Sequence, residues 1–347
     1  MINFKQLEVD EMLQRAEEYC LVDVRTEAEF SEGSIPGSIN LPLFNEEERE
    51  RIGIIYAKSH VAAKFLAMDF AGPKISRFVR SICRHSQGKP LLILCWRGGM
   101  RSHATVEFLN MVGMEAAQLR GGYHQYRRHI YQQLQEYKLE SQVIVLKGRS
   151  GTGKTEILRL LAQQGYPVLD LEGLARHRGS SFGDWEGEKP QSQKNFDSYL
   201  LEKLKSLRDS PYILLEGESR RIGNICLPEF LFAAMQKASV FEIYGSLPRR
   251  TEHILRDYTP ASPEARVNTY VALSRLIGIL SGGLFDELKQ CLDAEDYARF
   301  VELILVRHYD RLYEHKLPGK QVLARVNSDD IQRAAGEIAA FLDTDSR

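Results

Sequence analysis

Short apolar runs alternate with amphipathic segments along the first third of the chain. The runs LVDV (21–24) and LLILC (91–95) are bounded by charged residues, glycine or proline, as buried parallel strands are. Residues 46–57, 74–85 and 102–113 have the apolar spacing of helices. Strands that alternate with helices predict an α/β layer structure.

A second series of the same kind begins near residue 142. The strands predicted there are 142–147, 166–171, 211–216 and 239–244. A helix is expected at 154–164, and residues 126–141 are predicted to form a helix that joins the two series. We therefore predict an α/β domain at 1–135 and a second α/β domain at 136–347. From about residue 247 the second domain is expected to be mainly helical.

The composition is that of an ordinary globular protein, with 43% hydrophobic and 27% charged residues. No apolar run approaches the ~20 residues that span a bilayer, and the N-terminus lacks the apolar stretch of a signal peptide. Five cysteines without a C-x-x-C pair argue against a disulfide framework and a cysteine zinc site. These features predict a cytoplasmic protein with no membrane partner.

The formal net charge of -1 gives no overall attraction to nucleic acid. A nucleic-acid partner would therefore need local basic patches, because phosphate contacts supply much of the affinity. Arginine-rich stretches occur at 120–129, at 176–178 and at Arg220 with Arg221. Each could equally be a solvated face, so charge alone leaves the partner open.

The segment LLILC-WRGGM-RS places Cys95 directly after a predicted buried strand. A glycine-containing turn with Gly98 and Gly99 can direct backbone N–H groups at the sulfur, and the following helix N-terminus adds positive potential. Both effects favour a reactive thiolate. Arg97 and Arg101 add positive charge that could hold an incoming anion. The alternative, an inert buried cysteine, fits the other four cysteines better than this one.

Upstream of this loop, residues 23–42 (DVRTEAEFSEGSIPGSINLP) resemble the N-terminal signature of rhodaneses, although Ser34 stands where rhodaneses commonly have histidine. We interpret Asp23, Arg25 and Glu29 as structural polar pairs that support the loop. The loop C-x-x-G-G-x-R-S is one residue longer than the usual rhodanese loop, so its cradle could hold a larger anion. Its C-x5-R spacing is also that of cysteine phosphatases, which usually have histidine where this chain has leucine before the cysteine.

The segment VIVLKGRSGTGKTEILRLL fits the phosphate-loop motif G-x-x-x-x-G-K-[ST], with a strand before it and a helix after it. Backbone N–H groups around Gly148, Gly151 and Gly153 would cradle phosphates. Lys154 would neutralise their charge, and the Thr155 hydroxyl could ligate Mg²⁺. This motif predicts a phosphate or diphosphate site without requiring ATP hydrolysis.

The remaining groups expected near this site are less typical of nucleotide enzymes. In ILLEGES, Glu216 stands where aspartate is usual at the end of the second strand, and Glu218 is an alternative metal ligand. The guanine motif N-K-x-D is absent from the sequence, which disfavours a GTPase. A glycine-rich loop at 169–183 supplies groups for metals and anions: Asp170, Glu172, His177, Arg178 and Ser180.

Several long blocks, in order, resemble the tRNA 2-selenouridine synthase family over roughly residues 20 to 320. The most specific blocks are CWRGGMRS, LEGLARHRGS, ESRRIG and QSQKNFDSYL. The resemblance implies a rhodanese-like α/β domain followed by a P-loop NTPase-like α/β domain with a helical C-terminal region. The substrate implied is the wobble 2-thiouridine in the anticodon loop of tRNA. Selenophosphate is implied as the selenium donor, and geranyl diphosphate as the alkylating co-substrate.

The resemblance also implies roles for single residues. Cys95 becomes the nucleophile or selenium carrier, with Arg97, Gly98, Gly99 and Arg101 as its anion cradle. The P-loop residues 148–155 hold the diphosphate, with Mg²⁺ near Thr155 and either Glu216 or Asp170. The residues expected to contact diphosphate or tRNA are Arg178, Arg220 and Arg221. Trp96 and Tyr123 could stack on the wobble base.

Three other hypotheses about function each explain some of these sequence motifs. A rhodanese-type sulfurtransferase fused to an ATP-dependent P-loop module would deliver sulfur from a persulfide on Cys95 and hydrolyse nucleotide. A non-enzymatic P-loop regulator would not need Cys95 and its two flanking arginines. A phosphatase is disfavoured by Leu94 before the cysteine.

Overall fold

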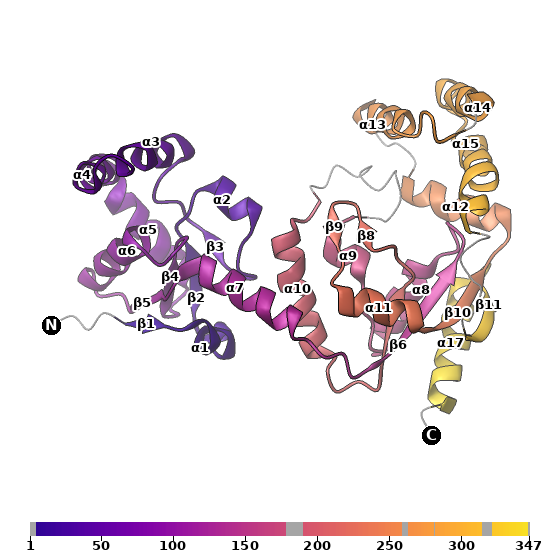
Figure 1. Cartoon of the computed structure of the whole chain (residues 1–347), viewed down its shortest axis with the longest axis horizontal. Helices are drawn as coiled ribbons and strands as arrows, with labels where there is room; N and C mark the ends of the chain where they lie inside the picture. Colours follow the sequence, from indigo (N-terminus) through magenta and orange to yellow (C-terminus); the bar gives the residue numbers. More distant parts are fainter. Residues whose placement is uncertain (1–4, 178–189, 259–262, 281, 314–320, 346–347) are drawn as a thin grey trace. The chain divides into compact units, whose positions relative to one another are not determined.

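The computed structural model describes residues 5–177, 190–258, 263–280, 282–313 and 321–345 (Figure 1). The chain forms two compact units. The first comprises Met1–Glu136 together with Ser192–Leu201, and the second comprises Tyr137–Gln191 and Glu202–Arg347. Among the described helices, none is long and apolar enough to cross a membrane.

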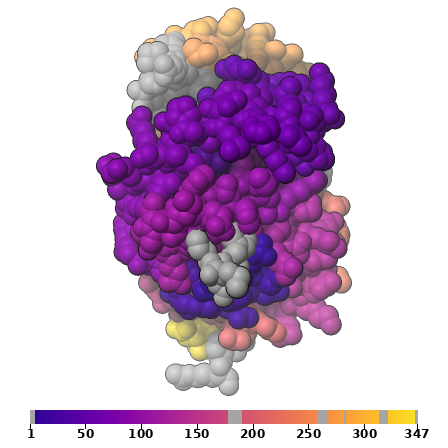
Figure 2. Space-filling model, turned by 90° about the vertical axis from the view of Figure 1, so that its left-hand side faces the viewer, coloured from indigo at the N-terminus to yellow at the C-terminus, as the bar shows by residue number. Residues whose placement is uncertain are grey.

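The first unit is built on a five-stranded parallel sheet in the order β1-β5-β4-β2-β3. Its strands are β1 (Gln6–Leu7), β2 (Cys20–Asp23), β3 (Ile39–Asn40), β4 (Leu91–Leu94) and β5 (Ala116–Leu119). Its helices are α1 (Val9–Gln14), α2 (Glu27–Glu32), α3 (Glu46–Tyr56), α4 (His60–Ala71), α5 (Ile75–Ser86), α6 (Met100–Met111) and α7 (Gly122–Gln135). Figure 2 shows one face of this unit, with the dark violet segment of α3 and α4 across its upper part.

The core of the first unit explains where the cysteine loop lies. Apolar side chains of β2 and β4 pack against α5 and α6 in one buried cluster, which includes Cys95 itself. All four side chains of β4 are fully buried, as the continuous apolar run LLIL predicts for a central parallel strand. The chain leaves β4 at Leu94 and enters α6 at Met100, so the five-residue loop 95–99 lies at the carboxyl end of the strand, where parallel α/β sheets commonly bind ligands.

The second unit contains a four-stranded parallel sheet in the order β11-β10-β6-β7. Its strands are β6 (Gln142–Gly148), β7 (Tyr212–Glu216), β10 (Ser239–Tyr244) and β11 (Val322–Asn327), with a separate small pair β8 (Arg221–Ile222) and β9 (Ile225–Cys226). This unit also contains the helices α8 (Lys154–Gln163), α9 (Leu171–Ala175), α11 (Glu229–Lys237) and α17 (Ile331–Asp345). Helix α10 (Gln193–Ser206) belongs to the first unit as far as Leu201 and to the second unit after it.

The helical region between β10 and β11 has its own buried cluster, drawn mainly from α13, α14 and α15. Its helices are α12 (Leu247–Tyr258), α13 (Pro263–Ser274), α14 (Gly282–Asp293), α15 (Tyr297–Ile304), a π-helical turn (Leu305–Tyr309) and α16 (Asp310–Tyr313). The mainly helical pattern predicted from about residue 247 is confirmed, but β11 returns the chain to the sheet after it.

Two further predictions need correction. The strand expected at 166–171 is wrong, since only Val168 forms an isolated bridge to Leu214. Asp170 then caps α9 by accepting a hydrogen bond from Gly173 N at 2.8 Å, so the chain turns into a helix instead of extending the sheet. The helix expected at 126–141 begins earlier, at Gly122, and ends at Gln135.

The sequence patterns did not predict that residues 192–201 return to the first unit. There the Ser34 N–H donates to Asn195 Oδ1 at 2.7 Å, and Arg127 forms an ion pair with Asp197 at 2.6 Å. Phe196, between these two residues of α10, is fully buried. The first unit is therefore completed by a segment that follows the P-loop in sequence.

Candidate functional site

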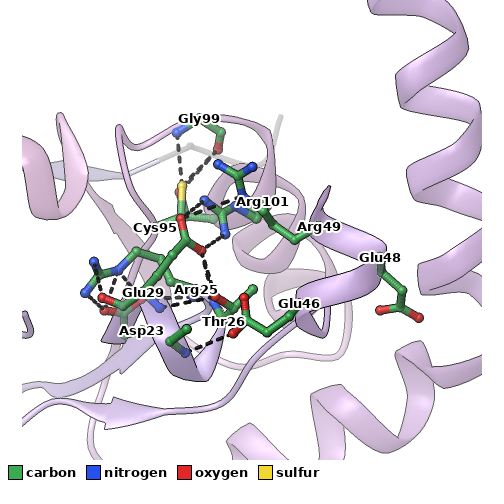
Figure 3. A network of polar contacts seen from close by, with 12 residues as sticks. Asp23, Arg25, Thr26, Glu29, Glu46, Glu48, Arg49, Cys95, Gly99 and Arg101 are labelled. Carbon is green, nitrogen blue, oxygen red and sulfur yellow. Dashed lines mark hydrogen bonds and ion pairs between the residues drawn. The ribbon is translucent and has the colours of Figure 1, made fainter. Parts of the chain in front are cut away.

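Cys95 lies at the carboxyl end of β4, with its sulfur enclosed by the loop that follows (Figure 3). The Gly99 N–H donates to Cys95 Sγ at 3.3 Å, and Ser102 Oγ lies 3.1 Å from the same sulfur. Ser102 is fully buried and also accepts a hydrogen bond from Gln118 Nε2 at 2.8 Å. The Gly99 N–H and the Ser102 hydroxyl therefore fix the position of the sulfur at the end of the strand, as a positioned nucleophile requires.

Glycines let the cysteine loop pack tightly against the start of α7. Gly98 has φ +62, and a side chain there would meet the Leu119 carbonyl oxygen at 2.9 Å. At Gly122, a Cβ would lie 2.2 Å from the Cys95 carbonyl oxygen. The same carbonyl accepts a hydrogen bond from Tyr123 N at 2.9 Å. The backbone around Cys95 is therefore fixed from two directions before any ligand binds.

The two arginines of the predicted anion cradle have different surroundings. Arg101 donates to both carboxylate oxygens of Glu29, at 2.7 and 3.2 Å. Burial would raise the pKa of the Glu29 carboxyl, but the hydrogen bonds and charge of Arg101 lower that pKa below its usual value. Arg97 is exposed and has no side-chain partner among the described residues. Arg97 is therefore the flanking arginine whose charge is available to an anion.

We expect the Glu29→Gln variant to lose stability at neutral pH but not in acid. A folded pKa below the unfolded value means that the ion pair stabilises the fold above about pH 4.3 and stops doing so as the pH falls through the folded pKa. Urea unfolding at pH 7 should show a loss of about 1–2 kcal/mol. At pH 3 the difference from wild type should shrink toward zero. Glutamine can keep the capping box with Thr26, so helix α2 is preserved. A difference independent of pH would contradict this account.

Asp23 and Arg25 form the structural pair that the sequence suggested. Both side chains are fully buried, and Arg25 Nη2 lies 2.6 Å from Asp23 Oδ2. Arg25 also donates to the carbonyl oxygen of Gly33 and stacks on the ring of Tyr123 at 4.0 Å. Because all these contacts are internal, the pair supports the loop and does not face a substrate.

The aromatic residues beside the loop separate into one buried and one accessible ring. Tyr123 is fully buried, and burial raises the pKa of its phenol to about 12. It therefore cannot stack on a base as the sequence suggested. Trp96 is partly exposed, and Lys194 Nζ lies 5.9 Å above its ring. Lys194 belongs to the returning segment, so sequence spacing gave no signal that it lies here.

The phosphate loop joins β6 to α8 in the arrangement that the motif predicts. Gly151 and Gly153 have φ +79 and +72, values that favour glycine. A side chain at Gly148 would meet the Ile243 carbonyl oxygen at 2.3 Å, so β10 packs directly against the base of the loop. These constraints shape the backbone into a loop before α8, whose N-terminus favours anions.

Lys154, Thr155 and Glu216 meet at the start of α8. Lys154 Nζ lies 3.1 Å from the Gly148 carbonyl oxygen and 3.2 Å from Glu216 Oε1. The Thr155 hydroxyl donates to Glu216 Oε2 at 2.8 Å. One carboxylate and one hydroxyl fit Mg²⁺, which commonly binds through one or two protein groups, waters and substrate phosphates. No cluster of three or more acidic, histidine or cysteine ligands occurs within the described ranges.

Asp170 and Arg220 make their described contacts away from this cluster. Asp170 caps α9, and its metal role stays a prediction. Arg220 forms an exposed ion pair with Glu229 at 2.8 Å, and Arg221 lies in β8. Arg178 and Ser180 lie outside the described residues.

Sequence reasoning missed a second layer of residues that hold the phosphate loop from α12. Arg250 Nε donates to the Ser150 carbonyl oxygen at 2.9 Å, and His253 Nδ1 lies 3.0 Å from the Gly151 carbonyl oxygen. Arg250 is 3% exposed and is held by both carboxylate oxygens of Asp310, at 2.6 and 2.9 Å. Asp310 follows the π-helical turn, a feature often found at functional sites. Arg250 and His253 contact carbonyl oxygens of the loop, so neither side chain occupies a loop N–H group.

Replacing Arg250 with methionine should weaken anion binding and the fold together. The change leaves the buried Asp310 carboxylate with only the longer contact to Arg149 Nη1 at 3.4 Å, so the unfolding free energy should fall by about 3 kcal/mol, the lower end of the cost of breaking a buried ion pair. It also frees the Ser150 carbonyl, so calorimetric titration with Mg²⁺ and pyrophosphate should show at least about tenfold weaker binding. Arg249→Gln, at an exposed neighbouring arginine, is the control. Unchanged pyrophosphate affinity in a folded Arg250→Met protein would refute the coupling.

Comparison with known proteins identifies the relatives of this chain. A family model described as the tRNA 2-selenouridine synthase AAA domain matches residues 141–276, and a rhodanese-like domain model matches residues 6–129. A tRNA 2-selenouridine synthase from Marinobacter nauticus is 33% identical over 335 residues, covering 87% of this chain and 89% of that protein. The chain belongs to the tRNA 2-selenouridine synthase family. The predicted fold class, a rhodanese-like domain followed by a P-loop domain with a helical C-terminal region, is confirmed.

Other members of the family align over a smaller part of their length. A tRNA 2-selenouridine synthase from Bdellovibrio bacteriovorus is 36% identical over 245 residues, which is 69% of this chain and 64% of that protein. In that alignment the chain spans less than two thirds of its relative. Among solved structures, a rhodanese-like domain protein from Staphylococcus aureus is 23% identical, with 35% of this chain and 91% of that chain covered and a TM-score of 0.24.

Proposed function

We propose that the protein is a transferase that converts wobble 2-thiouridine in tRNA to 2-selenouridine. The relatives are named for this activity. The main support for the proposal is that one chain contains two complementary sites. One site holds a sulfur nucleophile, Cys95, among N–H donors and arginine. The other holds a phosphate loop whose lysine, hydroxyl and carboxylate meet. A cytoplasmic location, where tRNA is found, is part of the proposal.

The first proposed reaction is alkylation of the tRNA sulfur by geranyl diphosphate. The thiouridine sulfur attacks the first carbon of the geranyl group, a C–S bond forms, the C–O bond to diphosphate breaks, and the base loses its N3 proton to solvent. Lys154 would bind the departing diphosphate, whose negative charge grows as the bond breaks. Thr155 and Glu216 would hold Mg²⁺, which when bound stabilises that same charge.

The second proposed reaction replaces the alkylated sulfur with selenium from selenophosphate. An alkylated sulfur leaves C2 more readily than a thiocarbonyl sulfur, so C2 becomes open to attack by selenium. Geranylthiol then departs with a proton. Cys95 would attack the phosphorus of selenophosphate: an S–P bond forms, the P–Se bond breaks, and the selenide released attacks C2. Water then cleaves the S–P bond, which gives phosphate and restores the thiol. The exposed Arg97 would attract the phosphate group. The wobble base lies in a single-stranded loop, so it can be displayed to the partly exposed Trp96.

Purified protein and tRNA that carries 2-thiouridine provide the test. Geranyl diphosphate is added first and selenophosphate second, and the nucleosides are analysed by mass spectrometry after each addition. The proposal expects S-geranyl-2-thiouridine after the first addition and 2-selenouridine after the second. Neither nucleoside, together with ATP hydrolysis or turnover of thiosulfate, would overturn it in favour of a sulfurtransferase with an ATP-dependent module.

A further inference from the structure

Helix α5 of the first unit carries a row of arginines on its exposed side. Arg77, Arg80 and Arg84 are spaced by three and four residues, which places them on one face of the helix. All three side chains belong to exposed residues. With a rise of 1.5 Å per residue, the row is about 10 Å long. This face was not among the basic stretches that the sequence patterns suggested.

The three charges are not neutralised within the protein. In the part of the chain that the structure describes, none of the three guanidinium groups forms an ion pair, and the one hydrogen bond is from Arg80 to Ser76 Oγ at 3.5 Å. In the stretches predicted from sequence, three arginines have carboxylate partners: Arg120 with Glu8, Arg127 with Asp197, and Arg220 with Glu229. Arg128 and Arg221 of those stretches form no ion pair within the described residues, but neither belongs to a row of three on one helix face. Uncompensated charge on a rigid helix is available to an external anion.

The opposite face of α5 decides which kind of anionic partner fits. Phe78, Val79 and Ile82 are each at most 9% exposed and belong to the core cluster that contains Cys95. A helix that binds a membrane surface must insert its apolar face, and here that face is already covered. A polyanion that needs charge alone, such as a nucleic-acid backbone, fits the exposed row.

The topology sets the direction of the row relative to the cysteine loop. Helix α5 directly precedes β4, which runs parallel to β2 in the same sheet. A helix in such a crossover runs back against the strands, so its first turn lies at the edge where β4 ends. Arg77 is therefore nearest the edge that carries Cys95, and Arg84 is farthest from it.

We propose that Arg77, Arg80 and Arg84 bind the phosphate backbone of the tRNA and guide its anticodon arm toward the Cys95 edge. This inference rests on the proposed function, since it assumes that tRNA is the substrate. The contacts are to phosphates, so the row contributes affinity and orientation but not sequence preference.

The test compares tRNA binding by wild type and by the triple variant Arg77→Gln/Arg80→Gln/Arg84→Gln across a series of salt concentrations. We expect at least about tenfold weaker binding near 0.1 M salt and a plot of log K against log salt that is shallower by about 2, since each lost phosphate contact removes 0.7–0.9. The KM for tRNA should rise while kcat for geranylation at saturating tRNA stays unchanged. Circular dichroism checks that the variant is folded.

The matched control removes three arginines that already have acidic partners: Arg15→Gln/Arg299→Gln/Arg333→Gln. It changes net charge equally and should leave affinity and salt slope close to wild type. Equal losses of tRNA affinity in both triple variants, or no loss in the α5 variant, would overturn the proposed role of the arginine row. Loss of binding to anionic vesicles with tRNA binding intact would overturn it in favour of a lipid surface. If the wild-type protein binds no tRNA, the proposed function is overturned, and the proposed role of the arginine row is overturned with it.

Discussion

Replacing Cys95 with alanine is expected to abolish selenium transfer while geranylation of 2-thiouridine continues. The Gly99 N–H and the Ser102 hydroxyl both lie against the Cys95 sulfur. Alanine removes this sulfur and therefore the proposed reactive atom. Loss of a covalent nucleophile typically costs about 10³-fold or more in rate. The measurement is 2-selenouridine formed from tRNA that already carries S-geranyl-2-thiouridine, followed by mass spectrometry of the nucleosides.

Cys20→Ala is a matched control for this experiment. Cys20 is also buried at a strand of the same sheet, but burial raises the pKa of its thiol, and its sulfur lies 3.6 Å from the His85 carbonyl oxygen instead of facing N–H donors. The substitution removes the same atom and should leave selenium transfer near the wild-type rate. If Cys95→Ala keeps more than about a tenth of that rate, the sulfur is neither nucleophile nor carrier.

Replacing Lys154 with methionine should have the opposite effect on the two reactions. Methionine keeps an unbranched side chain of similar length but removes the charge that lies between the Gly148 carbonyl and Glu216. Removing one group that stabilises developing negative charge costs about 10²–10³-fold in kcat. Geranylation should fall by that factor, whereas selenium transfer to tRNA that is already geranylated should remain.

Lys237→Met is the control, since Lys237 is exposed at the last turn of α11. Stability should be checked by thermal unfolding, because Lys154 also neutralises Glu216 in the absence of ligand. Equal loss of both reactions in Lys154→Met would indicate that the two half-reactions share the phosphate loop. Unchanged geranylation in this variant would show that the diphosphate does not bind at the phosphate loop.

The sequence by itself determined the two local motifs and the elements around them. In each motif a buried strand, a glycine-containing loop and a helix follow one another directly, so the residues that form the loop are neighbours in the chain. The strands β2, β4, β6, β7 and β10 were predicted for the same reason, as short apolar runs with clear boundaries. The run at 166–171 has the same pattern, and there Asp170 starts a helix before a strand can form.

Only the tertiary structure decided what surrounds those motifs. Glu29 and Arg101 are 72 residues apart, Arg250 and Asp310 are 60 apart, and Lys194 reaches Trp96 from a segment that follows the other motif. Periodicity tells which face of a helix is buried, but not which charged residue of another element it will meet. That is why Arg101 appeared free in the sequence and is paired in the structure. For the same reason, the arginine row of α5 can be recognised only in the structure, which shows that carboxylates do not pair with it.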